Sequence, residues 1–243
     1  MPALVSGARL MCVSQPEHPS RAGYAAITPA YRLLDVDHDT ALAHAERRLN
    51  AEFAILFDSG TIHRFLSSSY TEYTGRAKVT WYLPLLAERF ARQRLHALAK
   101  VQGRIPQPKP VVLFLCTHNA GRSQMALGFF IRDVGGRALA WSGGSEPSGS
   151  LNPAVVAAMA EIGIDISYEF PKTWTDEIIL AADVIVTMGC ADTCPLVPGP
   201  RYEDWIVDDP AGLPVAQIRP IRDEIGRRVV LLLDSLDLDV AAT

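Results

Sequence analysis

Cysteine is scarce in this chain, whose 243 residues include only Cys12, Cys116, Cys190 and Cys194. Four thiols are too few to hold a chain of this size together by disulfides, so the fold must depend on a buried apolar core. The cysteines are then left for chemistry, for metal binding or for packing. We interpret Cys12, which lies in a proline-containing stretch, as an incidental thiol.

The sequence also lacks long apolar runs and a strong charge of either sign. No run of about eighteen apolar residues occurs, which excludes a membrane-spanning helix. The formal net charge of −4 gives no general attraction to nucleic acid or to acidic membranes. Residues 1–23 contain no apolar segment followed by a cleavage site. We therefore expect no secretory signal and a cytoplasmic protein without nucleic-acid or membrane partners.

The N-terminal part of the chain predicts an irregular arm followed by helices. Residues 1–35 carry four prolines and no sustained periodicity, so we expect no regular structure there. From Asp39 onward, apolar residues recur every three or four positions, which is the spacing of one helix face. These residues are Leu42, Ala45, Leu49 and Phe53.

Two further amphipathic segments follow the first. We expect Ser59 to cap the second helix, Gly75 to end it, and Pro84 to lie in the first turn of the third. Short joints between amphipathic helices predict a three-helix bundle over residues 36–101. Dimerisation, docking of a partner and simple stabilisation all fit such a bundle, and no motif separates these roles.

Residues 102–110, "QGRIPQPKP", interrupt the helical pattern and predict a semi-rigid linker. Over residues 111–243, short apolar runs alternate with helical segments. The expected strands are Val111–Leu115, Leu139–Ser142 and Val184–Met188, and the expected helices are Ser123–Val134, Pro153–Ile162, Thr175–Ala181 and Val215–Leu236. This alternation predicts an α/β domain: a parallel sheet with helices on both faces and ligands at the carboxyl ends of its strands.

The segment after the first strand, "CTHNAGRS", predicts an anion-binding loop. A loop between a strand and a helix N-terminus turns backbone N–H groups inward and forms a cradle for a tetrahedral oxyanion, which also favours a thiolate at Cys116. Arg122 adds a planar fork for two oxygens. The expected oxyanion-binding residues are Thr117, His118, Asn119, Ala120, Gly121 and Arg122. The alternative is a buried packing cysteine beside a surface arginine.

Several residues of this loop have more specific expected roles. Ser123 can donate its hydroxyl to the Cys116 thiolate, Gly121 permits the tight turn before the helix, and Asn119 can brace the loop through its side chain. His118 either influences the cysteine or points to solvent.

The loop "CTHNAGRSQMA", together with "LNPAVVAAMAEIGIDIS", "VIVTMG" and "DDPAG", resembles the low-molecular-weight tyrosine phosphatases and the arsenate reductases built on that scaffold. The resemblance runs from about Val111 to the C-terminus. It implies a phosphatase-like parallel sheet, Cys116 as the nucleophile, Arg122 and the loop amides as oxyanion binders, and Ser123 as the stabiliser of the thiolate.

Transfer of an oxyanion to a thiolate needs an acid to protonate the departing oxygen. The segment "YEDWIVDDPAG" supplies the candidates. The family places its general acid directly before the proline, which implies Asp209, with Pro210 and Gly212 holding the bend. Asp208 is either a second acid or a solvated neighbour.

The segment "TMGCADTCPLVPG" distinguishes a phosphatase from a reductase, because a reductase must deliver two electrons and thiols can supply them. Cys190 and Cys194 follow the strand that should end beside Cys116. A zinc site at this pair lacks a second Cys/His pair with ligand spacing, so we expect no metal. An inert pair is the remaining alternative.

The pattern resembles the actinobacterial arsenate reductases, including those with a helical N-terminal extension. This implies that Cys116 binds arsenate, that Cys190 and Cys194 form a disulfide cascade, and that no cofactor is bound beyond an external thiol reductant. Thioredoxin is the expected reductant, and mycothiol with mycoredoxin is the alternative. Phosphate is a possible competing anion. Thioredoxin-type members often bind potassium through a glutamate on the first helix of this domain. Leu127 stands at the matching position here, so the resemblance does not carry a potassium site over to this chain.

Two rivals stay open at this stage. A low-molecular-weight tyrosine phosphatase would use the same Cys116 and Asp209 and would give neither later cysteine a redox role. A binding module would sense the anion without turnover, but it would have no chemical need for Cys116, Arg122, Ser123 and Asp209 together.

Overall fold

The computed structural model describes residues 37–75, 82–190, 194 and 196–236. The predicted irregular arm at residues 1–35, with Cys12, lies outside the described residues. Three helices come first: α1 (His38–Phe53), α2 (Ser59–Thr74) and α3 (Leu83–Val101). No helix that the structure describes has the length and apolar character needed to cross a membrane.

The apolar stripe predicted for the first helix packs against α2 and α3, with Ala45, Leu49 and Phe53 buried and Leu42 partly buried. Gly75 is the C-cap of α2, and Pro84 lies in the first turn of α3, as predicted. The predicted N-cap of α2 is wrong: Asp58 takes this position, because its carboxylate accepts the backbone N–H of Thr61 at 2.9 Å. Ser59 is the first residue of the helix.

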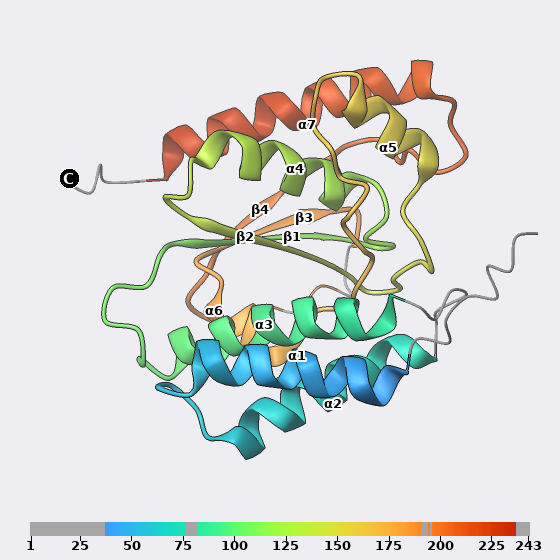
Figure 1. The fold of residues 1–243 in the computed structure, drawn as a ribbon. Helices are drawn as coiled ribbons and strands as arrows, with labels where there is room; N and C mark the ends of the chain where they lie inside the picture. Colours follow the sequence, from blue (N-terminus) through green and yellow to red (C-terminus); the bar gives the residue numbers. More distant parts are fainter. Residues whose placement is uncertain (1–36, 76–81, 191–193, 195, 237–243) are drawn as a thin grey trace, which may run out of the picture. The chain divides into compact units, whose positions relative to one another are not determined.

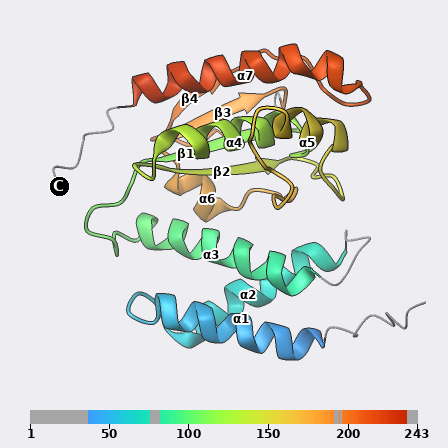
Figure 2. The ribbon, with the colours of Figure 1, turned by 45° about the horizontal axis from the view of Figure 1, so that its top comes forward.

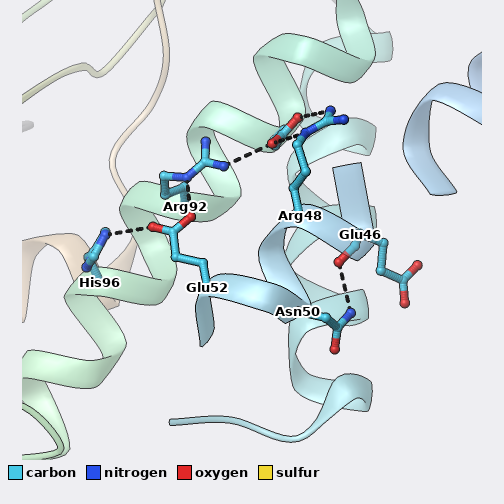
Figure 3. Close-up of polar contacts among 7 residues, drawn as sticks. Glu46, Arg48, Asn50, Glu52, Arg92 and His96 are labelled. Atoms are coloured by element: carbon cyan, nitrogen blue, oxygen red, sulfur yellow. Dashed lines mark hydrogen bonds and ion pairs between the residues drawn. The ribbon is translucent and has the colours of Figure 1, made fainter. Parts of the chain in front are cut away.

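An ion-pair network joins α1 to α3 (Figure 3). The buried Glu88 carboxylate lies between Arg48 and Arg92, at 2.6 and 2.9 Å, and Arg92 also binds Glu52 at 2.7 Å. Burial alone would raise the pKa of Glu88, but the hydrogen bonds from the two arginines outweigh it and lower that pKa. Burial, conversely, lowers the pKa of His96, which lies 3.4 Å from Glu52.

The sheet contains four parallel strands: β1 (Val111–Cys116), β2 (Leu139–Gly144), β3 (Val184–Met188) and β4 (Arg201–Asp204). Their order is β2-β1-β3-β4, so β1 lies between β2 and β3. The predicted parallel sheet is thereby confirmed. The sequence analysis missed β4, because "RYED" is an edge strand without an apolar pattern.

Helices cover both faces of the sheet (Figure 1). The helices α4 (Arg122–Val134), α5 (Pro153–Ala160) and α7 (Val215–Ser235) pack on one face, and α6 (Asp176–Ala181) packs on the other. The side chains of β1 alternate accordingly: Phe114 and Cys116 belong to the core under α4 and α7, whereas Leu113 and Leu115 belong to the core under α6.

Helix α3 extends the second core beyond α6 (Figure 2). Phe90 lies in the same apolar cluster as Leu113 and Leu115 of β1. Ion pairs border this contact: Arg89 binds Glu169 at 2.9 Å, Arg94 binds Glu177 at 2.5 Å, and Lys100 binds Asp183. The helical region and the sheet therefore share this second core. The domain limits at residues 36–101, 102–110 and 111–243 stay predictions.

Candidate active site

Cys116 lies at the end of the central strand β1, and the loop 117–121 connects it to α4. Met188 of β3 and Gly144 of β2 are its partners on the two sides, and only 2% of Cys116 is exposed. The strand–loop–helix arrangement expected from "CTHNAGRS" is therefore present, with the helix N-terminus directed at the loop. Such an N-terminus carries a partial positive charge and unpaired N–H groups.

The segment 146–152 holds the carbonyl groups of the loop. The backbone N–H groups of Glu146, Ser148 and Asn152 donate to the carbonyls of Thr117, His118 and Ala120 at 2.8, 3.0 and 3.0 Å. In a trans peptide the N–H points opposite to the C=O. The N–H groups of His118, Asn119 and Gly121 are thus directed away from this segment, as an anion-binding cradle requires.

Asn119 braces the loop from inside the protein. It is fully buried and has a φ of 47°, a conformation that asparagine tolerates better than most residues. Its Oδ1 accepts from the Lys172 N–H at 2.9 Å and from Gln124 at 3.1 Å, and its Nδ2 donates to Ser123 Oγ at 2.8 Å. The bracing expected of Asn119 is therefore visible as hydrogen bonds.

These bonds also determine where the Ser123 hydroxyl hydrogen points. An amide nitrogen can only donate, so Ser123 Oγ accepts from Asn119 and keeps its own hydrogen free. Cys116 Sγ lies 3.0 Å from Ser123 Oγ. Ser123 can therefore donate to a thiolate at Cys116.

Arg122 lies at the first turn of α4 with its guanidinium largely buried; 10% of the side chain is exposed. One of its nitrogens binds Asp209 Oδ2 at 3.2 Å. Both residues line a cleft of about 360 Å³ that also contains Cys116. The arginine fork, the thiol and a carboxylate thus meet in one cavity.

Asp209 is presented by a loop that approaches Gly121 closely. The Asn152 side chain donates to the Pro210 carbonyl at 3.1 Å. A Cβ on Gly121 would lie 2.7 Å from Pro210, whereas the φ of Gly121 is −137°, so the glycine is needed for space. The expected reason, a tight turn before the helix, stays a prediction alongside this steric one. Asp208 is exposed and, unlike Asp209, is not among the residues lining the cleft.

The side chain of His118 is exposed and lines the same cleft, with Nδ1 3.1 Å from the Glu146 carbonyl. Asn152, which caps α5 and holds the Asp209 loop, was not singled out in the sequence, although "NP" before an apolar run is a helix-start signal. Within residues 37–75, 82–190, 194 and 196–236, no group of three or more His, Cys, Asp or Glu side chains is arranged to hold a metal ion.

Cys190 and Cys194 form a disulfide with a Cα–Cα distance of 5.8 Å, while Cys116 is a free thiol. Cys190 follows β3, the strand next to β1, but its side chain belongs to the core under α3 and α6. Cys116 belongs to the core on the opposite face. The structure therefore groups Cys116, Arg122, Ser123 and Asp209 together and holds the disulfide on the other side of the sheet.

Lys172 is a buried lysine behind the loop that the sequence analysis did not single out. It is 1% exposed, with Nζ 3.3 Å from Ser142 Oγ and 4.6 Å from the centre of the Phe170 ring. Burial lowers its pKa from 10.5 to about 8. Its backbone N–H binds Asn119, so the residue supports the loop directly. No periodicity marks a lysine in "FPKTW" as buried.

We expect Ser123→Ala to slow the alkylation of Cys116 by iodoacetamide about tenfold at pH 7, because a hydrogen bond to a charged group contributes about 1.5 kcal/mol. The rate is followed by mass spectrometry of the Cys116 peptide. Ser148→Ala, in the same cleft, is the control and should react like the wild type. Equal rates for both variants would contradict the assigned hydrogen bond.

We expect Lys172→Met to change how stability depends on pH. Because the folded pKa is below the unfolded one, native Lys172 binds fewer protons between about pH 8 and 10.5, and wild-type stability gains with pH in that window. Below about pH 8 Lys172 is charged in the folded protein, and burial of that charge lowers the free energy of unfolding by its full amount. The variant should lack this gain, which amounts to roughly 3 kcal/mol of unfolding free energy.

Urea unfolding at a series of pH values measures this effect. Lys109→Met, which removes an exposed lysine, is the control and should follow the wild-type profile. Parallel profiles for wild type and Lys172→Met would contradict the buried charge.

Two known families match the chain. Residues 111–242 match the family described as "Low molecular weight phosphotyrosine protein phosphatase". Residues 42–99 match the one described as "Protein-tyrosine-phosphatase-like, N-terminal domain". The first match covers the sheet and the cleft, and the second covers most of the three N-terminal helices.

Several curated relatives are named arsenate reductases. Arsenate reductase 1 of Staphylococcus epidermidis is 40% identical over 121 residues, which cover 48% of this chain and 90% of that protein. The arsenate reductase of Halalkalibacterium halodurans is 42% identical over 130 residues, covering 50% and 93%. A solved structure titled a thioredoxin-dependent arsenate reductase of Corynebacterium glutamicum is 37% identical, with a TM-score of 0.73, and covers 84% of this chain and all of that one.

Proposed function

Because this chain belongs to the low molecular weight phosphotyrosine protein phosphatase family, we propose that it uses the scaffold of that family to reduce arsenate to arsenite. The resemblance inferred from "CTHNAGRSQMA" and the segments after it is confirmed by the family match. The observation that carries the proposal is the Cys190–Cys194 disulfide, which begins two residues after the partner of Cys116 in β3. Hydrolysis of a phosphate ester needs only water after the first step, so it gives such a pair no redox role in turnover.

In the first step, the Cys116 thiolate attacks the arsenic of a bound arsenate. The loop amides and Arg122 hold the oxyanion, and Ser123 stabilises the thiolate. A sulfur–arsenic bond forms, an arsenic–oxygen bond breaks, and Asp209 gives its proton to the oxygen, which leaves as water. Asp209 is well placed for this role, since it lines the cleft beside Arg122.

The second step reduces the arsenic. The Cys190 thiolate attacks Cys116 Sγ; a disulfide forms, and the electron pair of the sulfur–arsenic bond stays on arsenic, which departs as arsenite. Cys194 then attacks Cys190, which frees Cys116 and leaves the Cys190–Cys194 disulfide. The two thiols supply the two electrons. These two steps would leave Cys116 as a free thiol and Cys190 and Cys194 joined in a disulfide, which is the state of the three cysteines in the structure.

An external dithiol must then reduce the disulfide, and we assign this role to thioredoxin in the cytoplasm. The likeness to a structure titled thioredoxin-dependent, which extends over the helical region, supports this choice over mycothiol with mycoredoxin. Cys194 is partly exposed, whereas Cys190 is 4% exposed. An incoming thiolate would therefore attack Cys194 and release Cys190 inside the protein.

Arsenate-dependent oxidation of NADPH tests the proposal. One reaction contains thioredoxin and its reductase, and the other contains mycothiol, mycoredoxin and their reductase. Turnover with thioredoxin alone is the expected result. Turnover with mycothiol alone would mean that mycothiol, and not Cys190, attacks Cys116 and releases arsenite. Hydrolysis of p-nitrophenyl phosphate without arsenate turnover in either reaction would identify a phosphatase instead.

We expect Cys194→Ser to produce about one arsenite per enzyme and then stop, because Cys190 can release arsenite but the Cys116–Cys190 disulfide is not resolved. Quantification of arsenite in a single-turnover and a steady-state assay measures this. Cys12→Ser is the control and should keep turning over. Steady-state activity of Cys194→Ser equal to that of the wild type would refute the cascade.

A further inference from the structure

Gly189 lies between the arginine of the cleft and the first cysteine of the disulfide. Resting on the proposed function, we propose that Gly189 is a positioning residue for Arg122. Because Gly189 has no side chain, the Arg122 guanidinium can pack directly against its backbone, a place that we call the seat of the guanidinium. A change in the Gly189 backbone that moves Cys190 would therefore also change this seat. Neither the motif of the anion loop nor the cysteine pattern assigns it this role.

The first evidence is the space beside Gly189. A Cβ at this position would lie 2.5 Å from one terminal nitrogen of Arg122, 3.3 Å from Cζ and 3.6 Å from the other nitrogen. The guanidinium therefore packs directly against the Gly189 backbone on one side, while it binds Asp209 at 3.2 Å. A methyl group at residue 189 would displace the arginine fork from this seat.

The second evidence is the conformation of Gly189 and the bond that holds it. Its φ of 73° lies in the left-handed region that favours glycine. Its carbonyl accepts the hydroxyl of Thr117, the residue after the nucleophile, at 2.9 Å. The anion loop thus holds the Gly189 peptide, and the Gly189 peptide in turn backs Arg122.

The third evidence is the position of Gly189 in the chain. The preceding Met188 is the strand partner of Cys116, whereas the following Cys190 lies in the core on the opposite face of the sheet. For Cys190 to reach Cys116, the backbone at Gly189 must rotate, and this rotation would break the bond from Thr117. The seat of Arg122 is therefore intact while Cys190 is paired with Cys194, and it opens as Cys190 attacks Cys116. The protein would thus loosen its hold on the oxyanion at the step that releases arsenite.

Phosphate binding by the purified full chain tests this role without any arsenate chemistry. Isothermal titration with inorganic phosphate compares the wild type with Gly189→Ala and with Gly163→Ala. Gly163 has a similar φ of 76° but nothing within 4 Å of its position for a Cβ, so it reproduces the backbone strain alone. We expect the Kd for phosphate to rise at least about tenfold in Gly189→Ala, because a charge-assisted fork is lost, and less than twofold in Gly163→Ala.

Thr117→Val provides a second variant that does not strain the backbone. It removes the hydroxyl that holds the Gly189 carbonyl, and a severalfold rise in the phosphate Kd is expected. If Gly189→Ala does not fold, Thr117→Val decides the test by itself. Phosphate affinity in Gly189→Ala and Thr117→Val within twofold of the wild type would overturn the role of Gly189 and leave the proposed function standing. A wild type that binds no phosphate would overturn both.

Discussion

The inner side of the loop 117–121 is held by one buried side-chain amide, that of Asn119, on which the Ser123–Cys116 contact depends. Its oxygen accepts from the backbone of Lys172 and its nitrogen donates to Ser123, so the side chain has one orientation only. That orientation leaves the Ser123 hydroxyl free for Cys116, and the left-handed backbone of Asn119 turns the loop toward α4. A buried amide without these partners would cost about 1–3 kcal/mol for each unmet bond, so the loop has little freedom to relax.

The support behind Asn119 reaches into the N-terminal helices. The Lys172 ammonium lies 4.6 Å from the centre of the Phe170 ring, and the Arg89 guanidinium of α3 lies 5.0 Å from it. Tyr73 of α2 packs edge-on against the same ring. Helices α2 and α3 therefore close the core around Phe170, which also covers the buried Lys172. Helices α2 and α3 thereby support the loop 117–121 indirectly, through Phe170 and Lys172.

The elements with the strongest local signals were predictable from the sequence. The apolar run before Cys116, the loop and α4 follow from composition and spacing, and so do the helical stripes of α1 and α3. Lys172, the space at Gly121 and the seat at Gly189 were not predictable, because each depends on residues that are brought together only by the fold. The edge strand β4 was missed because its side chains are exposed or only partly buried, so its sequence shows no apolar pattern. Asp58 was missed as a cap because Ser59 beside it has the same preference.

The distinction between hydrolysis and reduction lies outside the cleft. Cys116, Arg122, Ser123 and Asp209 would serve either reaction, since both begin with attack of a thiolate on a tetrahedral oxyanion. What adds reduction is the turn at Gly189, which interrupts the alternation of β3: Met188 shares the core of Cys116, whereas Cys190 lies in the core on the opposite face. Cys116 is therefore a free thiol on one face of the sheet, while Cys190 is paired with Cys194 on the other. Gly189 is the residue at which the chain changes face, so the approach of Cys190 to Cys116 in the proposed cascade requires a change in its backbone.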